Sequence, residues 1–98
     1  MRALMLGDII AAARALRAVP PDTRGLAIDM MLDQAHAAHL YHKRRSKPHP
    51  DWGNGSLMAR ALKEKLVPEP FSSDTGYLLT LQVVIAAILA RKIIRTTA

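Results

Sequence analysis

Four side chains in the middle of the chain have the types and the spacing that could ligate a metal ion. A carboxylate and three imidazoles recur every three residues, at Asp33, His36, His39 and His42. Because three residues fall short of one helical turn, the series drifts round a helix and only neighbouring members share a face. Two neighbours could bind zinc and His49 could join them from a later loop, but a catalytic zinc site usually has three protein ligands, and sequence alone brings no other group here. We interpret the series as a polar helix face with partly buried imidazoles and predict no metal or other cofactor, with zinc binding as the alternative.

A pair of acids on the same stretch could transfer protons. Asp29 and Asp33 are four residues apart, so they share one face of a helix. Such pairs are more often solvated, or bound to an arginine of a neighbouring helix, than used for acid–base chemistry. The sequence has no nucleophile with its base, no phosphate-binding glycine motif and no zinc signature. We therefore predict that the protein is not an enzyme, and we assign no catalytic residue.

A short basic run could bind phosphates. The formal net charge is +6, and the one cluster of cations is the run Lys43, Arg44, Arg45 and Lys47. Phosphate contacts of this kind give salt-sensitive affinity without reading a base sequence. Cations are also favourable at the carboxyl end of a helix, so the run has a structural explanation as well. These four residues, with Arg91, Lys92 and Arg95 if they lie nearby, are the candidate nucleic-acid-binding residues.

The segment from His49 to Ser56 has the composition of a loop with a defined backbone conformation. Pro50 fixes its own φ, while Gly53 and Gly55 can adopt positive φ and Asn54 tolerates it. The segment holds the only Trp of the chain, and this side chain either plugs one end of the core or serves as an exposed anchor for a partner. The candidate protein-binding residues are those with polar or aromatic side chains: His49, Asp51, Trp52 and Asn54.

Four helices must position these groups. Apolar spacing predicts helices from about Asp8 to Ala18, from Asp22 or Thr23 to Lys43 or Arg45, from Ser56 to about Leu66, and from Ser73 or Asp74 to about Arg95. Prolines separate them, and no alternating pattern indicates a strand. We expect an all-α fold: one compact four-helix domain over residues 1–98 with a long apolar C-terminal core helix.

The last helix should supply most of the core. From Tyr77 to Ala90 it is apolar apart from Thr80 and Gln82, yet this run is shorter than the about 20 residues that cross a bilayer, so we expect no membrane contact. Phe71 should be buried, and Ile85→Asp should unfold the domain. The large side chains expected in the core are Leu78, Leu81, Val84, Ile85, Ile88 and Leu89.

The chain contains no cysteine, which excludes disulfides, thiol nucleophiles and thiolate metal sites. That composition fits a cytosolic protein. Asp8 interrupts the apolar run that a secretory signal would need near the first residues. We expect a cytoplasmic protein.

Three stretches resemble a short family of alphaproteobacterial proteins of unknown function: Gly7–Arg14 (GDIIAAAR), His49–Met58 (HPDWGNGSLM) and Glu69–Tyr77 (EPFSSDTGY). The middle stretch is the most specific, and the resemblance spans the whole chain. Some members are encoded close to a regulator of gene transfer agents, the phage-like particles that package host DNA. The resemblance implies a role in the expression or assembly of such particles; it implies no catalytic residue.

The sequence therefore predicts a non-enzymatic helical adaptor that binds another protein, such as a component of transcription or of phage-like particle assembly. The alternative is a small basic nucleic-acid-binding protein. Self-association is a third hypothesis, because Met30, Met31 and Met58 could form an adaptable apolar surface.

Overall fold

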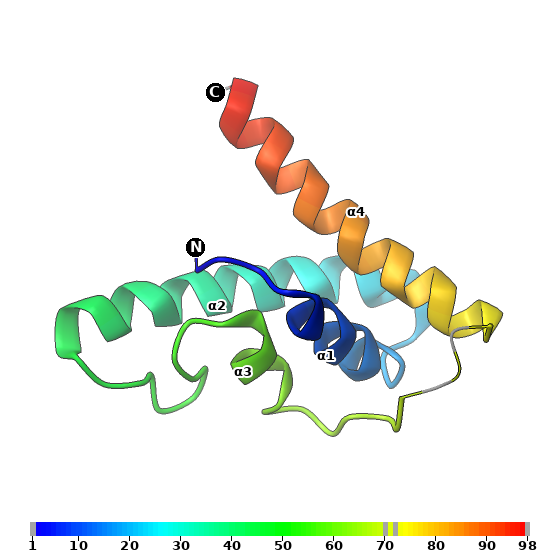
Figure 1. Ribbon diagram of the computed structural model, residues 1–98, viewed down its shortest axis with the longest axis horizontal. Coiled ribbons are helices and arrows are strands. Elements are labelled where there is room, and N and C mark those ends of the chain that lie inside the picture. The colour runs from blue at the N-terminus through cyan, green and yellow to red at the C-terminus, as the bar shows by residue number, and fades with distance from the viewer. Residues whose placement is uncertain (1, 70, 72, 98) are drawn as a thin grey trace.

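The computed structural model describes residues 2–69, 71 and 73–97, and of residues 94–97 it describes the backbone alone. Its elements are α1 (Leu6–Leu16), the short 3-10 turn η1 (Pro21–Thr23), α2 (Arg24–Arg45), α3 (Leu57–Ala61) and α4 (Thr75–Thr97) (Figure 1). The described residues form no strand ladder. The expected all-α domain of four helices is confirmed.

The helices form three layers. α1 and α2 lie together in the middle, and each of them contacts both α3 and α4. α3 covers one side of this pair, while α4 crosses the other side and then extends beyond it (Figure 1). The core is therefore centred on α1, whose buried residues are mostly alanines: Ala11, Ala12, Ala13 and Ala15.

The buried carboxylate of Asp8 joins α1 to α3. One oxygen, Oδ2, accepts a hydrogen bond from the Met5 backbone N–H at 2.7 Å, which satisfies a free donor at the start of α1. The other oxygen, Oδ1, accepts from the Met58 backbone N–H of α3 at 2.8 Å. The sequence analysis placed Asp8 at this helix start, but the second bond crosses fifty residues of chain and could not be foreseen.

Side chains of α2 fix the neighbouring elements. Arg24 Nε donates to the carbonyls of Leu16 and Val19, both at 2.9 Å, and so caps the carboxyl end of α1. Gln34 Oε1 accepts from Arg60 Nε of α3 at 2.6 Å. These contacts hold α1 and α3 against the same long helix.

α3 is shorter than the sequence predicted. It begins after Ser56, whose Oγ accepts from the Ala59 N–H at 3.0 Å, so the expected cap is confirmed. It ends at Ala61 instead of Leu66, because the chain then turns back along α1. There the Val67 carbonyl accepts from Arg14 Nε at 2.8 Å, and the Val67 N–H donates to the Arg14 carbonyl at 3.4 Å.

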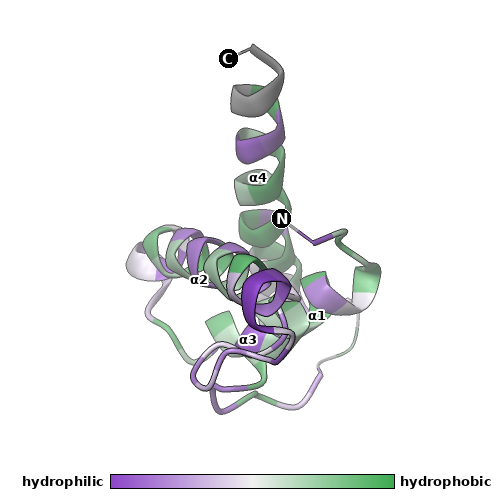
Figure 2. Cartoon of the chain, turned by 90° about the vertical axis from the view of Figure 1, so that its left-hand side faces the viewer, coloured by the Kyte–Doolittle hydropathy of each residue, from purple (hydrophilic) through white to green (hydrophobic). Residues whose placement is uncertain are grey.

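α4 is the expected long apolar helix, but it lies in the core along only one face. Tyr77, Thr80, Val84 and Ile88 are buried, and Leu81 packs beside them. The expectation that Leu78, Ile85 and Leu89 are core residues is wrong: they are 48%, 43% and 52% exposed. The reason is that α4 crosses α1 and α2 once and nothing in the described chain covers its outer side (Figure 2). Ile85→Asp is therefore not expected to unfold the monomer.

Phe71 is also misplaced by the sequence analysis, since it is 87% exposed. It lies in the connector that runs over the surface between α3 and α4. Its carbonyl accepts from the Asp74 N–H at 2.9 Å, so the residue shapes the turn into α4 through its backbone.

The bonds of Asp8 predict a large effect of a small substitution. Asp8→Ala should lower the free energy of unfolding by about 2–3 kcal/mol, because it leaves two part-buried N–H groups without acceptors. Urea denaturation followed by circular dichroism measures this, with the exposed Asp22→Ala as control. A loss for Asp8→Ala no larger than that for the control would show that the carboxylate does not hold α1 and α3 together.

Candidate protein-binding loop

The loop after α2 closes on itself through its backbone. His49 and Gly53 form an antiparallel bridge in which each N–H donates to the carbonyl of the other, at 2.7 Å and 3.1 Å. Gly53 has a φ of 83°, a conformation that few residues other than glycine adopt at low cost. The predicted positive φ of Gly53 is confirmed, and it makes this tight closure possible.

His49 holds the tip of the loop. Its Nδ1 accepts from the backbone N–H groups of Asp51 at 3.0 Å and Trp52 at 3.2 Å. Its ring stacks on the Trp52 ring, with centroids 4.5 Å apart and planes inclined by 6°. One side chain therefore fixes both the backbone and the indole.

The stacked pair is anchored to α2. The Tyr41 ring meets His49 edge-on at 4.9 Å, and the Arg45 guanidinium lies 5.7 Å from the Tyr41 ring centroid, within cation–π range. The four side chains form a row from the loop to the carboxyl end of α2, which we call the Trp52 row: Trp52, His49, Tyr41 and Arg45. The sequence analysis missed Tyr41, although its position one turn before Arg45 could have indicated it.

The far side of the loop rests on α2. Gly55 has a φ of 102°, and a Cβ at this position would lie 2.6 Å from the Cα of His39. Asn54 Oδ1 accepts from the Ser56 N–H at 3.0 Å, and the Asn54 carbonyl accepts from Arg2 at 3.3 Å. Burial lowers the pKa of His39, and the charge of Lys43 lowers it further.

Trp52 is half-buried, so the structure matches neither alternative of the sequence analysis completely. One ring face is covered by His49, yet the side chain is not sealed beneath the core. Asp51 beside it is exposed, and Asn54 is half-buried. The four predicted protein-binding residues thus lie together on one rigid loop.

The basic run borders this loop. Lys43, Arg44, Arg45 and Lys47 are all exposed around the end of α2, where Ser46 ends the helix in the left-handed region. They form one basic surface, which shares Arg45 with the Trp52 row.

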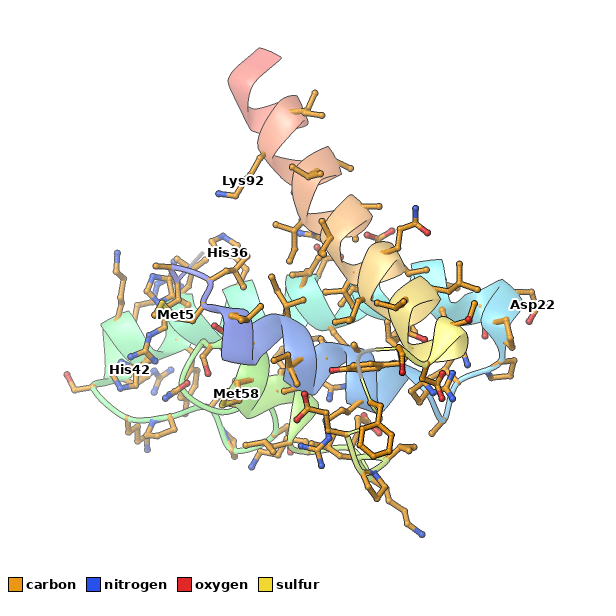
Figure 3. All side chains as sticks on the ribbon, turned by 45° about the vertical axis from the view of Figure 1, so that its right-hand side comes forward. Met5, Asp22, His36, His42, Met58 and Lys92 are labelled. Carbon is orange, nitrogen blue, oxygen red and sulfur yellow. The ribbon has the colours of Figure 1, made fainter. Side chains whose placement is uncertain are left out.

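Arg91 and Lys92 of α4 lie away from this surface. Arg91 donates to Asp33 Oδ1 at 2.7 Å and to the Asp29 backbone carbonyl at 2.9 Å. Of the two acids, Asp33 therefore binds an arginine of a neighbouring helix through its carboxylate, whereas Asp29 contributes only its backbone oxygen to this contact. Lys92 lines the same cleft as His36, whereas His42 lies nearer the carboxyl end of α2 (Figure 3). The side chain of Arg95 lies outside those that the structure describes.

The histidines of α2 are separated as their spacing implied. His36 lines a cleft of about 680 Å³ between the amino-terminal segment, α2 and α4, whereas His39 lies under Gly55 and His42 points to another side of α2 (Figure 3). The described residues contain no group of three or more His, Cys, Asp or Glu that could hold a metal ion.

The three methionines do not form one surface. Met31 is buried, whereas Met30 and Met58 are exposed on different helices. The surface proposed for self-association in the sequence analysis is therefore absent from the described residues.

Comparison with known proteins gives one finding. A family model described as Domain of unknown function (DUF7742) matches residues 2–88, a range that contains the loop, α2 and most of α4. No curated protein matches the chain. No solved structure matches it either.

The contact between Gly55 and α2 predicts opposite effects for two glycine substitutions. Gly55→Ala should destabilise the protein by about 2 kcal/mol or more, because the new methyl group meets backbone atoms and the φ is unfavourable. Gly25→Ala is the matched control: no heavy atom lies within 4 Å of its Cβ position, and it should stabilise α2 by up to about 1 kcal/mol.

Urea denaturation measures both effects, and fluorescence of the single Trp52 reports on the loop. Equal stability of the Gly55→Ala variant and the unchanged protein would contradict the described packing of the loop on α2.

Proposed function

We propose that the chain, which belongs to the family of that domain of unknown function, is a non-enzymatic adaptor that binds another protein through the Trp52 row. The observation that carries the proposal is the half-buried indole, stacked on His49 at 4.5 Å and held by a closed loop. A large aromatic side chain in a fixed position loses little conformational entropy on binding, which is the property of an interface anchor.

The surroundings of Trp52 support the same use. The exposed Asp51 and the half-buried Asn54 can provide the polar rim that surrounds an aromatic anchor in protein interfaces. The exposed basic surface from Lys43 to Lys47 adds positive charge on one side. The partner that fits is therefore a protein with an apolar pocket for an indole and acidic residues at its edge.

The biological setting that we propose comes from the resemblance of the three sequence stretches. It is the regulation or assembly of gene transfer agent particles in the cytoplasm, with the partner in the transcription machinery or the particle. In this proposal the chain has no catalytic role and carries no cofactor.

Replacement of the indole tests the adaptor. Trp52→Ala should weaken partner binding by about 2 kcal/mol or more while the helices remain folded, because the indole is the anchor. Phe71→Ala is the matched control, since it removes an aromatic ring that is 87% exposed elsewhere on the surface.

The measurement is affinity purification from cells that carry the family member, followed by mass spectrometry and by titration of the recovered partner. Recovery of the same partner in unchanged yield by the Trp52→Ala variant would overturn the proposal.

Nucleic-acid binding is the second candidate, favoured by one observation. The exposed cations at the end of α2 lie beside stacked rings, the combination that proteins use to hold phosphates and bases of single strands. In this alternative Lys43, Arg44, Arg45 and Lys47 contact the backbone of the strand.

A salt titration separates the two candidates. Binding of labelled DNA should weaken steeply with rising salt if the basic surface is used, and Arg44→Glu with Arg45→Glu should abolish it. Lys63→Glu with Lys65→Glu changes the net charge equally at exposed positions after α3 and serves as control. Absence of binding at low salt rejects the alternative and leaves the adaptor.

A further inference from the structure

The outer face of α4 is mostly apolar from Leu78 to Ile93. Five large side chains on this face are between 43% and 61% exposed: Leu78, Leu79, Ile85, Leu89 and Ile93. Ala86 and Ala90 lie between them, and Gln82 is the one polar side chain of the stripe before Lys92. α4 is thus mostly apolar both towards the other helices and away from them, and most of its ribbon is green in Figure 2, with a purple turn near its carboxyl end.

A helix that is apolar all round is normally covered on all sides. Thr75–Ile93 has a mean hydropathy of 1.6, enough by length and composition to cross a membrane, yet only 22% of it is buried. A covering partner for the outer face is therefore expected, and three occupants are conceivable: lipid, an unrelated protein or a second copy of this chain.

The contacts of α4 argue against lipid. Tyr77, Thr80 and Val84 are packed into the body, and Arg91 is bound to Asp33 at 2.7 Å and to the Asp29 carbonyl. Insertion across a bilayer would break all of these contacts. It would also move the Arg91 and Lys92 charges towards the hydrocarbon region, which is costly.

The outer stripe is spaced for pairing with another helix. Leu79, Gln82, Ala86, Leu89 and Ile93 follow steps of three and four residues, the spacing of a coiled-coil seam. In an antiparallel pair centred on position 84 this spacing is self-complementary. Leu79 then lies opposite Leu89 of the partner subunit, and Gln82 lies opposite Ala86 of the partner subunit.

The charges at the two ends of α4 select the same arrangement. Asp74, whose side chain is 42% exposed and lies 4.0 Å from Arg17, precedes the amino end of α4, while the exposed Lys92 lies near its carboxyl end. An antiparallel pair brings each acidic end to a basic end and also opposes the helix dipoles. A parallel pair would bring like charges together.

We propose that the protein forms a two-fold symmetric dimer through the outer faces of two antiparallel α4 helices. The interface is isologous, so each contact occurs twice. The carboxyl-terminal part of α4 extends beyond α1, α2 and α3 (Figures 1 and 2). In the dimer this part packs against the amino-terminal part of the partner's α4. The other three helices of each subunit then lie at opposite ends of the helix pair. The Trp52 row takes no part in this interface, so the dimer and the adaptor can fail independently.

The first experiment measures mass by light scattering over a range of concentrations. The unchanged protein should have twice the chain mass of 10.8 kDa, and Leu89→Lys should weaken the dimer at least tenfold, giving the chain mass at the same concentration. Leu26→Lys is the matched control, because Leu26 is 67% exposed on α2 and lies outside the stripe; it should leave the dimer intact.

The second experiment determines whether the two α4 helices are antiparallel or parallel. It does not depend on the folding of the Leu89→Lys variant. The chain has no cysteine, so single-cysteine variants report one position each. Leu79→Cys and Leu89→Cys, mixed in equal amounts and oxidised, should cross-link mainly to each other. In a parallel pair each variant would cross-link to itself, since the two positions are about 15 Å apart along the helix.

Three outcomes would overturn the proposal. A chain that is monomeric at every concentration has no such interface. Self-cross-linking of each variant shows a parallel pair. Binding of the monomeric chain to phosphatidylglycerol vesicles, lost in Leu89→Lys, shows that lipid covers the face instead.

Discussion

The close approach of helices around α1 is the constraint from which the rest of the structure follows. Ala11, Ala12, Ala13 and Ala15 are buried, and side chains of this size allow three other helices to pack around a helix of only 11 residues. Larger residues would push the neighbours apart, because interiors are packed too densely to absorb the extra volume. The Asp8 carboxylate then fixes α3 at the start of α1, and Arg24 fixes α2 at its end.

The rigidity of the loop derives from this arrangement. With α3 held by Asp8, the segment before it must cross α2 at close range, and Gly55 makes that crossing possible against His39. The His49–Gly53 bridge closes the remaining residues into a tip that presents the indole. A loop with this support loses little conformational entropy when it binds a partner, which is the physical basis for the proposal that it forms a protein-binding surface.

The sequence predicted the local features and missed the long-range ones. The four helices, the Ser56 cap and the positive φ of Gly53 and Gly55 depend on neighbouring residues, and each is confirmed. The chain also belongs to a family of unknown function. The length of α3 depends on Arg14, fifty-three residues from Val67. The exposure of Phe71 and the row from Trp52 to Arg45 depend equally on which segments meet in space, and no local pattern contains that information.

α4 shows why hydropathy alone could not place the core. Its residues are apolar in every direction, so periodicity gave the helix but no preferred face, and length alone favoured a fully buried position. Tyr77, Thr80, Val84 and Ile88 are the buried residues of the helix. Two hydrogen bonds hold this orientation, from the Tyr77 N–H to Asp74 at the start of α4 and from Arg91 to Asp33 further along. Most of the other large apolar residues of α4 are on the opposite face of the helix and are therefore exposed to solvent. In the proposed dimer a second copy of the chain covers them, because the spacing of the stripe is self-complementary.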